Sequence, residues 1–316
     1  MSSKLPCKIC GLENPEPSHF WRTHKIKESE YYIQYYNKKS LLTGEPIVFK
    51  NRDQYIFSDF ADKHELKKYL KQSVPNEQKK YLKEILIRRK EHKDLIYTPT
   101  QVELRSTDGM VGVKTYNDIM GSYYKLCAEI GFKSKGFNDI GRNTILKKIK
   151  TIQDNMILVD SREQSVLNFK NMDIEIVTLP YGDYTIKNND SNIFIERKSL
   201  SDFLGTMSKG LERFKDELNR AKENGGYIIM LVETNLADTL SFEYKPFINK
   251  HTKATAPFIF HNVRGLLQNF TNFQVAFCNG RPEMARIIKL IFEYGDFFKI
   301  HDLQLAIDYK LFNEGI

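Results

Sequence analysis

The strongest constraint on the fold is a change of pattern at Met156. From there to Cys278, six short runs rich in β-branched and aromatic residues alternate with turns and helical stretches. The first four runs lie close together, as in a meander, and helical patterns separate the last two. This order predicts an α/β domain in which a mixed sheet is flanked by helices. The runs are MILVD, IEIVTLP, DYTI, IFIERK, YIIMLVE and FQVAFC.

Positive charge is concentrated in the first half of the chain. Residues 1–150 hold 29 Lys and Arg against 18 Asp and Glu, whereas residues 151–316 hold 19 against 22. A basic half predicts a polyanionic partner such as nucleic acid, although a solvated lysine-rich surface would look the same.

No run approaches the roughly 18 apolar residues of a membrane span, and the N-terminus lacks the apolar segment of a secretory signal. We therefore expect an intracellular protein, in the cytoplasm of a bacterial host or associated with its nucleoid, with reduced cysteines.

Charged side chains gather where the predicted strands begin or end. Successive side chains of a strand alternate between faces, so Glu196 and Lys198 share one face and Arg197 points to the other. The loop KNNDSN folds the strand that carries Asp183 back beside them. Two carboxylates are suitable ligands for Mg²⁺ or Mn²⁺, and a neighbouring lysine can orient a water. The alternative interpretation is a set of strand-end charges in salt bridges.

Three motifs carry a resemblance to a known family. VDSRE, LPYGDY and IERKSLSDFLGTM, in this order and spacing, resemble the nuclease domain of the XPF/Mus family, a branch of the PD-(D/E)XK restriction-endonuclease-like folds with a GDxxxxERKxxxD signature. The resemblance covers about residues 156–295. It implies that Lys198 orients the attacking water, and that Mg²⁺ or Mn²⁺ is bound by Asp160, Asp183 and Glu196 with support from Glu163. It also implies that Arg162, Arg197 and Asp202 order the site or hold the scissile phosphate.

The sequence after the signature predicts a helix that packs against the core. Its apolar face runs from Leu200 to Leu218 and ends at Gly225. Lys209, Arg213 and Lys215 on its polar side are candidate phosphate contacts, with plain solvation as the alternative.

Family members usually carry a tandem helix-hairpin-helix module after the nuclease domain, but only about twenty residues follow Gly295 here. We therefore expect DNA contacts in the N-terminal half. The resemblance also implies a homodimer through apolar helices of the nuclease domain. The candidates for that surface are 258–270 and 284–295, which could equally belong to the core.

The N-terminus has the ligand pattern of a zinc site. Cys7 and Cys10 are followed by His19 and His24, in the arrangement C-x2-C-x8-H-x4-H. Two thiolates and two imidazoles satisfy tetrahedral Zn²⁺. The short middle spacer resembles the two-Cys, two-His fingers of phage and mobile-element DNA-binding proteins. The alternative is a reduced cysteine pair whose neighbouring histidines only cap or pack.

The segment Thr98–Phe132 resembles the repeat associated with homing endonucleases of the HNH class. The residues that carry the resemblance are Thr98-Pro99-Thr100, Thr115-Tyr116, Gly121-Ser122-Tyr123 and Gly131-Phe132. Such a repeat is a small helical unit that contacts DNA, and a generic helical linker is the alternative. Its expected phosphate contacts are Lys114, Lys133, Lys135 and Arg142.

Together these patterns predict a modular DNA-cutting enzyme. Residues 1–30 form a zinc finger, 31–93 a charged hairpin and helical segment, 94–150 a helical DNA-binding repeat with a linker, and 151–316 the nuclease domain. The predicted function is a metal-dependent endonuclease on double-stranded DNA, site-directed like a phage or mobile-element homing enzyme. Three alternatives stay open: structure-specific cutting of flaps, forks or Holliday junctions in repair and recombination, a non-catalytic DNA-binding scaffold, and an RNA substrate.

Overall fold

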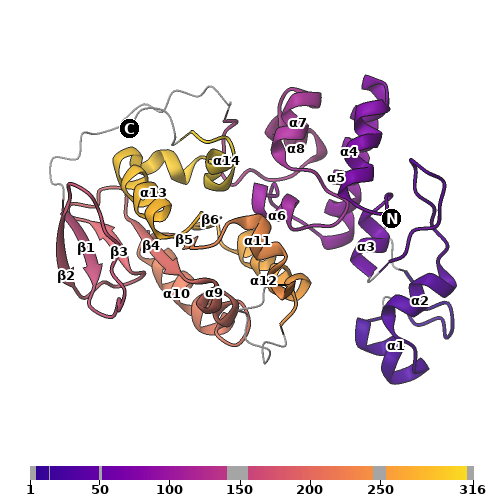
Figure 1. Ribbon diagram of the computed structural model, residues 1–316, viewed down its shortest axis with the longest axis horizontal. Helices are drawn as coiled ribbons and strands as arrows, with labels where there is room; N and C mark the ends of the chain where they lie inside the picture. Colours follow the sequence, from indigo (N-terminus) through magenta and orange to yellow (C-terminus); the bar gives the residue numbers. More distant parts are fainter. Residues whose placement is uncertain (1–4, 14, 50–51, 141–155, 245–253, 312–316) are drawn as a thin grey trace. The chain divides into compact units, whose positions relative to one another are not determined.

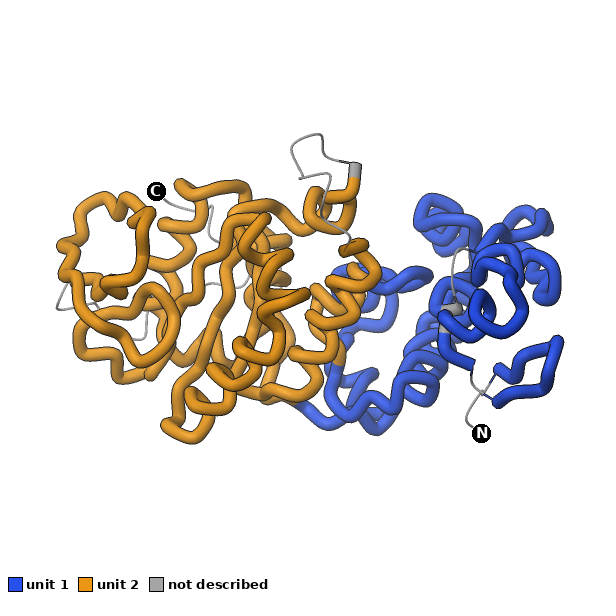
Figure 2. Tube along the Cα trace, turned by 90° about the horizontal axis from the view of Figure 1, so that it is seen from below, with its two compact units in different colours: residues 1–98, 107–134 blue, residues 99–106, 135–316 orange. Residues whose placement is uncertain are grey.

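The structure is a computed structural model that describes residues 5–13, 15–49, 52–140, 156–244 and 254–311. The chain forms two compact units (Figure 2). The N-terminal unit comprises residues 1–98 and 107–134, and the sheet unit comprises residues 99–106 and 135–316. Among the helices described, none combines the length and the apolar character needed to cross a membrane.

The sheet unit is built on six strands, one for each predicted run (Figure 1). Across the sheet they follow the order β2 (Asp173–Val177), β1 (Met156–Asp160), β3 (Tyr184–Ile186), β4 (Ile193–Lys198), β5 (Tyr227–Val232) and β6 (Phe273–Phe277). The pairs β1–β2, β4–β5 and β5–β6 are parallel, and β3 is antiparallel to both β1 and β4. The predicted mixed sheet is confirmed.

The meander expected for the first four strands is wrong. β2 pairs in parallel with β1 at the edge of the sheet, with Asp160 opposite Val177, and β3 lies on the other side of β1. A parallel pair needs a crossover connection, and the segment 161–172 supplies it. As a result, β3 and β4 lie side by side in the middle of the sheet and are joined by the predicted loop. Because they are antiparallel, the start of β3 lies beside the end of β4, and the charged residues at these two ends come together.

Helices flank both faces of the sheet. α9 (Leu200–Thr206), α10 (Leu211–Glu223) and α12 (Ala256–Asn269) bury Phe203, Phe214 and Phe260 against alternate residues of the central strands. The single helix predicted from Leu200 onward is therefore two helices, interrupted at 207–210. α13 (Arg281–Tyr294) and α14 (Leu303–Asp308) lie on the opposite face (Figure 1). The remaining short elements are α11 (Leu236–Leu240) and the 3-10 turns Phe242–Tyr244 and Gly295–Lys299.

The short helix α6 (Gln101–Arg105) belongs to the sheet unit, although the residues on both sides of it belong to the N-terminal unit. Its first backbone amide donates to the buried carboxylate of Asp302 at 2.6 Å. At its last residue, Arg105 makes an ion pair of 2.8 Å with Asp308. The segment expected to be one module over 94–150 is thus divided, with 99–106 in one unit and α7 (Val113–Met120) and α8 (Tyr123–Ile130) in the other.

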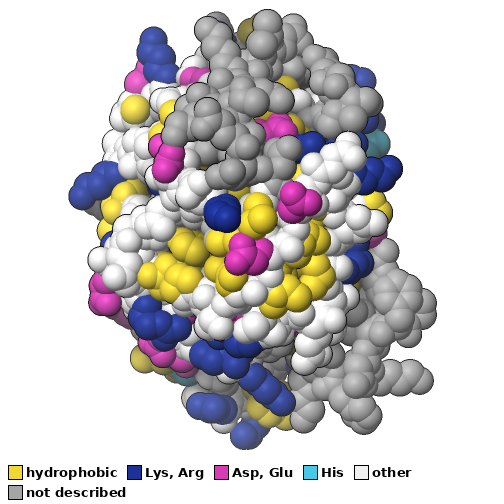
Figure 3. Space-filling model, turned by 90° about the vertical axis from the view of Figure 1, so that its left-hand side faces the viewer, with side chains coloured by type: hydrophobic (Ala, Val, Ile, Leu, Met, Phe, Trp, Pro, Cys, Tyr) yellow, Lys and Arg dark blue, Asp and Glu magenta, His cyan; other side chains and the backbone are white. Residues whose placement is uncertain are grey.

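The edge strand β2 exposes apolar side chains. Ile174 and Ile176 are 42% and 66% exposed, because none of the described helices and strands covers them. Figure 3 views the molecule from the side of β1 and β2, and hydrophobic side chains gather near the middle of that view. An exposed strand edge of this kind is available for pairing with another chain.

The N-terminal unit is helical. An aromatic cluster joins its first two helices, where Phe20 stacks on Tyr31 with ring centroids 4.1 Å apart. The hairpin expected after residue 31 is reduced to one antiparallel bridge between Lys39 and Pro46. The charged helix predicted before residue 94 is α5. The helices other than α7 and α8 are α1 (Pro17–His24), α2 (Glu28–Tyr35), α3 (Arg52–Phe57), α4 (Lys63–Gln72) and α5 (Pro75–Lys93).

Candidate active site and metal centre

The ends of β3 and β4 bring the central acids of the signature together. The backbone amide of Arg197 donates to Asp183 Oδ2 at 2.7 Å, and the amide of Asp183 donates to the Ile195 carbonyl at 2.7 Å. Lys198 Nζ lies 2.5 Å from Glu196 Oε1. Strand alternation therefore places the Glu196 and Lys198 pair on one face and the Arg197 guanidinium on the other, as predicted.

The glycine before Asp183 has a steric reason to be there. Gly182 has a φ of 62°, in the left-handed region, and a Cβ at this position would lie 2.8 Å from the Ile195 carbonyl oxygen. Only glycine combines this backbone conformation with so close an approach to β4. Gly182 and Asp183 of the signature therefore act together, because the glycine allows the chain to approach β4 closely enough for Asp183 to lie at its end.

Burial makes the two carboxylates hard to ionise. Desolvation raises the pKa of Asp183 to about 6, against the lowering effects of the Arg197 amide and Lys198. Desolvation, followed by the charge of Asp183, raises the pKa of Glu196 to about 8, while Lys198 opposes the shift. Burial alone would lower the pKa of Lys198, but the charge of Glu196 raises it. Lys198 is therefore an ammonium, and the acidic pair holds a proton to a higher pH than a free carboxyl does.

The donor set fits a hard divalent cation. Among the residues that the structure describes, neither Asp183 Oδ1 nor Glu196 Oε2 accepts a hydrogen bond. Two buried carboxylates with a free oxygen each repel one another, and a cation between them would relieve the repulsion. These are the two residues that would hold Mg²⁺ or Mn²⁺.

Asp160, which we expected to be a metal ligand, is held by hydrogen bonds from two neighbouring residues, and its role as a ligand stays a prediction. Its carboxylate accepts two bonds from the Arg162 guanidinium, at 2.6 and 3.0 Å, and one each from the Arg162 and Leu179 amides at 2.8 Å. Burial would raise the pKa of Asp160, but these hydrogen bonds lower it. Both carboxylate oxygens thus accept hydrogen bonds, and through Leu179 Asp160 ties the segment after β1 to the loop between β2 and β3.

The Glu163 carboxylate binds the side chain of Arg197. The Arg197 guanidinium holds both of its carboxylate oxygens, at 2.8 and 3.0 Å, and the Ser165 amide donates to Oε1 at 2.6 Å. Glu163 therefore lies on the Arg197 side of β4, opposite the Glu196 and Lys198 pair. In this arrangement Glu163 fixes Arg197, and its expected support of the metal stays a prediction.

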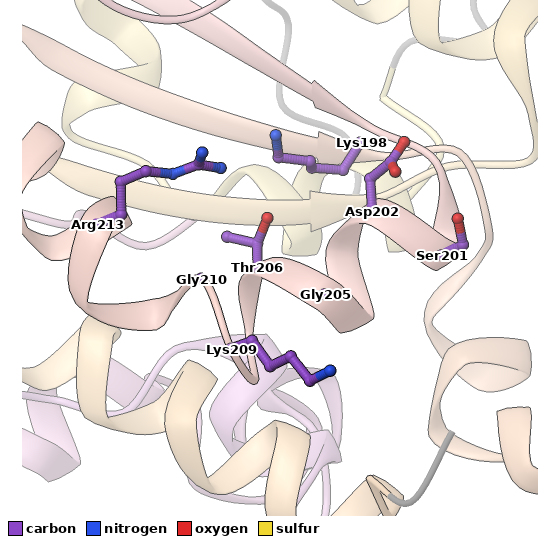
Figure 4. Close-up of a pocket in the computed structure, with 8 residues that line it drawn as sticks. All are labelled: Lys198, Ser201, Asp202, Gly205, Thr206, Lys209, Gly210 and Arg213. Atoms are coloured by element: carbon purple, nitrogen blue, oxygen red, sulfur yellow. The ribbon is translucent and has the colours of Figure 1, made fainter. Parts of the chain in front are cut away.

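A cationic groove opens beside Lys198 (Figure 4). It has a volume of about 510 Å³ and follows the turn between α9 and α10. Figure 4 shows Lys198, Lys209 and Arg213 around it, with Asp202 near the end of β4. Asp202 accepts a hydrogen bond of 2.6 Å from Ser199 at the start of α9. Glycines and hydroxyls complete the lining, at Ser201, Gly205, Thr206 and Gly210.

One acid of the site, Glu217, was not predicted from the sequence. Glu217 on α10 accepts a hydrogen bond of 3.1 Å from the Gly182 amide. Its charge raises the pKa values of both Glu196 and Lys198, so it lies near the pair. The available signal was the helical spacing, because Glu217 follows Arg213 by four residues and shares its face.

The second candidate metal site lies in the N-terminal unit. The ligand atoms of Cys7, Cys10, His19 and His24 all lie within 4.8 Å of one another, and this is the sole such cluster in the described part of the chain. The sulfur–nitrogen distances Cys7–His24 and Cys10–His19 are both 3.4 Å. Two thiolates and two imidazoles at this separation fit a tetrahedral zinc ion.

The basic residues expected to contact phosphate differ in how exposed they are. Lys114 and Lys133 are exposed on the N-terminal unit, where Lys114 lies 3.8 Å from Asp118. Lys135 contradicts the prediction, because its side chain is 2% exposed in the sheet unit and lies 3.7 Å from Glu103. A buried, paired ammonium cannot reach a phosphate. Arg142 falls outside the described residues.

Comparisons with known proteins agree with the geometry of the sheet unit. Residues 159–291, less than half of the chain, match a family model described as the ERCC4 domain. The matched residues form the mixed sheet flanked by helices, and this part of the chain is similar to the ERCC4 domain.

Solved structures of XPF from Aeropyrum pernix are similar to about half of this chain. One shares 19% identity, with 48% of this chain and 71% of that chain covered and a TM-score of 0.33. Another, in complex with DNA, also shares 19% identity, with 51% and 75% covered and a TM-score of 0.33. Curated proteins gave no match to this chain.

Proposed function

We propose that this chain is a metal-dependent DNA endonuclease that hydrolyses a phosphodiester bond at the ends of β3 and β4. One observation carries the proposal. The Asp183 and Glu196 carboxylates and the Lys198 ammonium converge in an ERCC4 domain, beside an open groove that carries two more cations. Phosphodiester hydrolysis needs this combination of hard ligands and positive charge.

Asp183 and Glu196 are the residues that hold Mg²⁺ or Mn²⁺ in this proposal. When bound, such an ion supplies Lewis-acid stabilisation of charge on the phosphate and makes water more acidic. The free oxygens of the two carboxylates and their raised pKa values support the assignment. Because the carboxyls must lose protons to bind metal, metal binding at this site releases protons.

Lys198 orients the attacking water, and its charge stabilises the phosphate. The short contact with Glu196 keeps its pKa above the ordinary lysine value, so it acts as a cationic donor at neutral pH. Lys209 and Arg213 continue the positive charge along the groove and hold neighbouring phosphates of the cut strand. Asp202, at the first turn of α9, shapes the mouth of this groove.

The N-terminal unit supplies further DNA contacts and binds zinc. The assembled Cys and His ligands support the zinc assignment, and the exposed Lys114 and Lys133 support the DNA contacts. The similarity of Thr98–Phe132 to a homing-type repeat favours site-directed cutting of double-stranded DNA. Cutting of flaps, forks or junctions is the second candidate, favoured by the ERCC4 domain itself.

The decisive experiment compares cleavage of supercoiled plasmid, linear duplex and a four-way junction in Mg²⁺. Wild type is run beside Glu196→Ala and Lys198→Ala, and binding of each substrate is measured in parallel. Cutting that both variants lose establishes the nuclease. Preference for the junction selects structure-specific processing, and cutting at one duplex sequence selects the homing-like function. Intact binding without cutting would replace the proposal with a non-catalytic scaffold.

A further inference from the structure

A row of alternating charges crosses the sheet on the side of β4 opposite Glu196 and Lys198. It begins at Glu163 after β1, which Arg197 of β4 binds through two hydrogen bonds. The remaining Arg197 nitrogen lies 2.7 Å from Glu233 Oε1, at the end of β5. The same carboxylate oxygen accepts a bond of 3.0 Å from Arg281, which follows β6. Four residues from four strand ends therefore form one ionic chain.

Arg281 closes this chain into a ring. Its second terminal nitrogen donates to the carbonyls of Ser165 and Val166 at 2.8 and 3.0 Å. Those residues belong to the loop that follows β1 and carries Glu163, whose carboxylate also accepts from the Ser165 amide. Arg281 thus ties the start of α13 to the loop at the other end of the row. Only the guanidinium fork can make these bonds together, because a lysine ammonium lacks the geometry.

The ring contacts the metal-binding acids through Arg197. The backbone amide of Arg197 donates to Asp183 Oδ2, which leaves Oδ1 directed away from that bond. The Arg197 and Glu163 side chains are 12% and 4% exposed, so each depends on its ionic partners for compensation of its charge. Loss of one link leaves a buried charge without its partner, and the strand end that presents Asp183 would rearrange.

We propose that Arg281, which lies outside the signature motifs, is a positioning residue of the active site. It fixes the Glu163 loop and Glu233, which together fix Arg197 and, through the Arg197 amide, the orientation of Asp183. The inference rests on the proposed function, because it assigns Asp183 to a divalent cation. Partners that orient metal ligands commonly contribute a factor of about 10 to 100 in metal affinity or activity.

The test measures Mn²⁺ binding by calorimetry in the zinc-loaded full chain, together with the rate of DNA cleavage. Arg281→Ala is compared with Lys289→Ala, a surface residue of the same helix with a similar exposure, 37% against 38%. We expect Arg281→Ala to weaken Mn²⁺ binding about tenfold and to lower kcat, with KM for DNA unchanged. Arg281→Lys should recover only part of the affinity, and Lys289→Ala should behave as wild type.

Glu233→Gln provides a second variant, because it weakens the same ring without removing side-chain volume. It should shift Mn²⁺ binding in the same direction, and Glu196→Ala should abolish binding at this site. A folded Arg281→Ala protein with wild-type Mn²⁺ affinity and kcat would overturn the inference and leave the nuclease proposal standing. Wild-type protein that binds Mn²⁺ but cuts no DNA would instead overturn the proposed function.

Discussion

The two candidate metal sites are assembled in different ways. The Cys and His ligands come from the local segment 7–24, in which a turn and the single helix α1 bring two thiols and two imidazoles together. The carboxylate site depends on the pairing of β3 with β4 and on α10, and its ligands are buried and hard to ionise. Local spacing therefore predicts the first site, whereas tertiary structure sets the second. Their ligand chemistry differs too, so they should respond independently to mutation and to chelators.

The largest expected effect follows loss of a carboxylate in the sheet unit. Glu196→Ala or Asp183→Ala should lower the cleavage rate about 1000-fold or more, because the stabilisation of phosphate charge by a bound cation is lost. Single-turnover cleavage of saturating DNA measures this effect. Asp216→Ala, an exposed acid on α10, is the control and should leave the rate unchanged. Loss of DNA binding or of zinc in the first two variants would show that the sites are not independent.

The complementary experiment removes a zinc ligand. Cys10→Ala should abolish zinc binding and weaken DNA affinity about tenfold or more, because structural zinc contributes directly to the folding of small modules. Zinc content and DNA affinity are measured side by side. Leu12→Ala changes an exposed residue of the same loop and should retain the metal. The comparison between the sites fails if Cys10→Ala lowers cleavage at saturating DNA as much as Glu196→Ala does.

A smaller effect is expected in the cationic groove. The double change of Lys209 and Arg213 to Ala should raise KM for DNA about tenfold, because two phosphate contacts are lost. The slope of log affinity against log salt should fall by roughly 2, since each phosphate contact contributes about 0.9. Lys222→Ala, exposed in the last turn of α10, is the control. An unchanged salt dependence would remove the groove from the DNA-binding surface.

The smallest effect concerns stability. The pKa of Glu196 is raised from its ordinary 4.5 to about 8, so folding of the metal-free protein favours the protonated acid. The stability that this group contributes is present below about pH 4.5 and is lost as the pH rises toward 8. Glu196→Gln should therefore raise the unfolding temperature by a few degrees (about 2–4 °C) at pH 8 but not at pH 4.5.

Thermal unfolding of the metal-free protein across this pH range measures the difference. Glu212→Gln, which changes an exposed acid of α10, is the control. If Glu196→Gln and the wild type unfold at the same temperature at pH 8, ionisation of Glu196 does not destabilise the folded protein, and the prediction is wrong. Mg²⁺ should raise the unfolding temperature of the wild type at pH 8, because the bound cation takes the place of the proton on Glu196.

The sequence predicted what depends on local periodicity and spacing. The six strands, the shared face of Glu196 and Lys198, and the zinc-type ligand spacing all follow from patterns within about twenty residues. The sequence did not predict which partner each charge would find. Glu163 pairs with Arg197, and Lys135, which we expected to be exposed, is buried beside Glu103. Both contacts join residues more than thirty positions apart in the chain, which no pattern within a single strand contains.

The position of α6 has a consequence for any attempt to exchange parts of this protein. Residues 99–106 belong to the sheet unit while both neighbouring segments belong to the N-terminal unit, so the chain passes between the units at 98–99, 106–107 and 134–135. A domain graft joined after residue 150 would discard the helix whose amide holds Asp302 and whose Arg105 binds Asp308. The two units are therefore interlaced in sequence, and a transplant would have to preserve all three junctions.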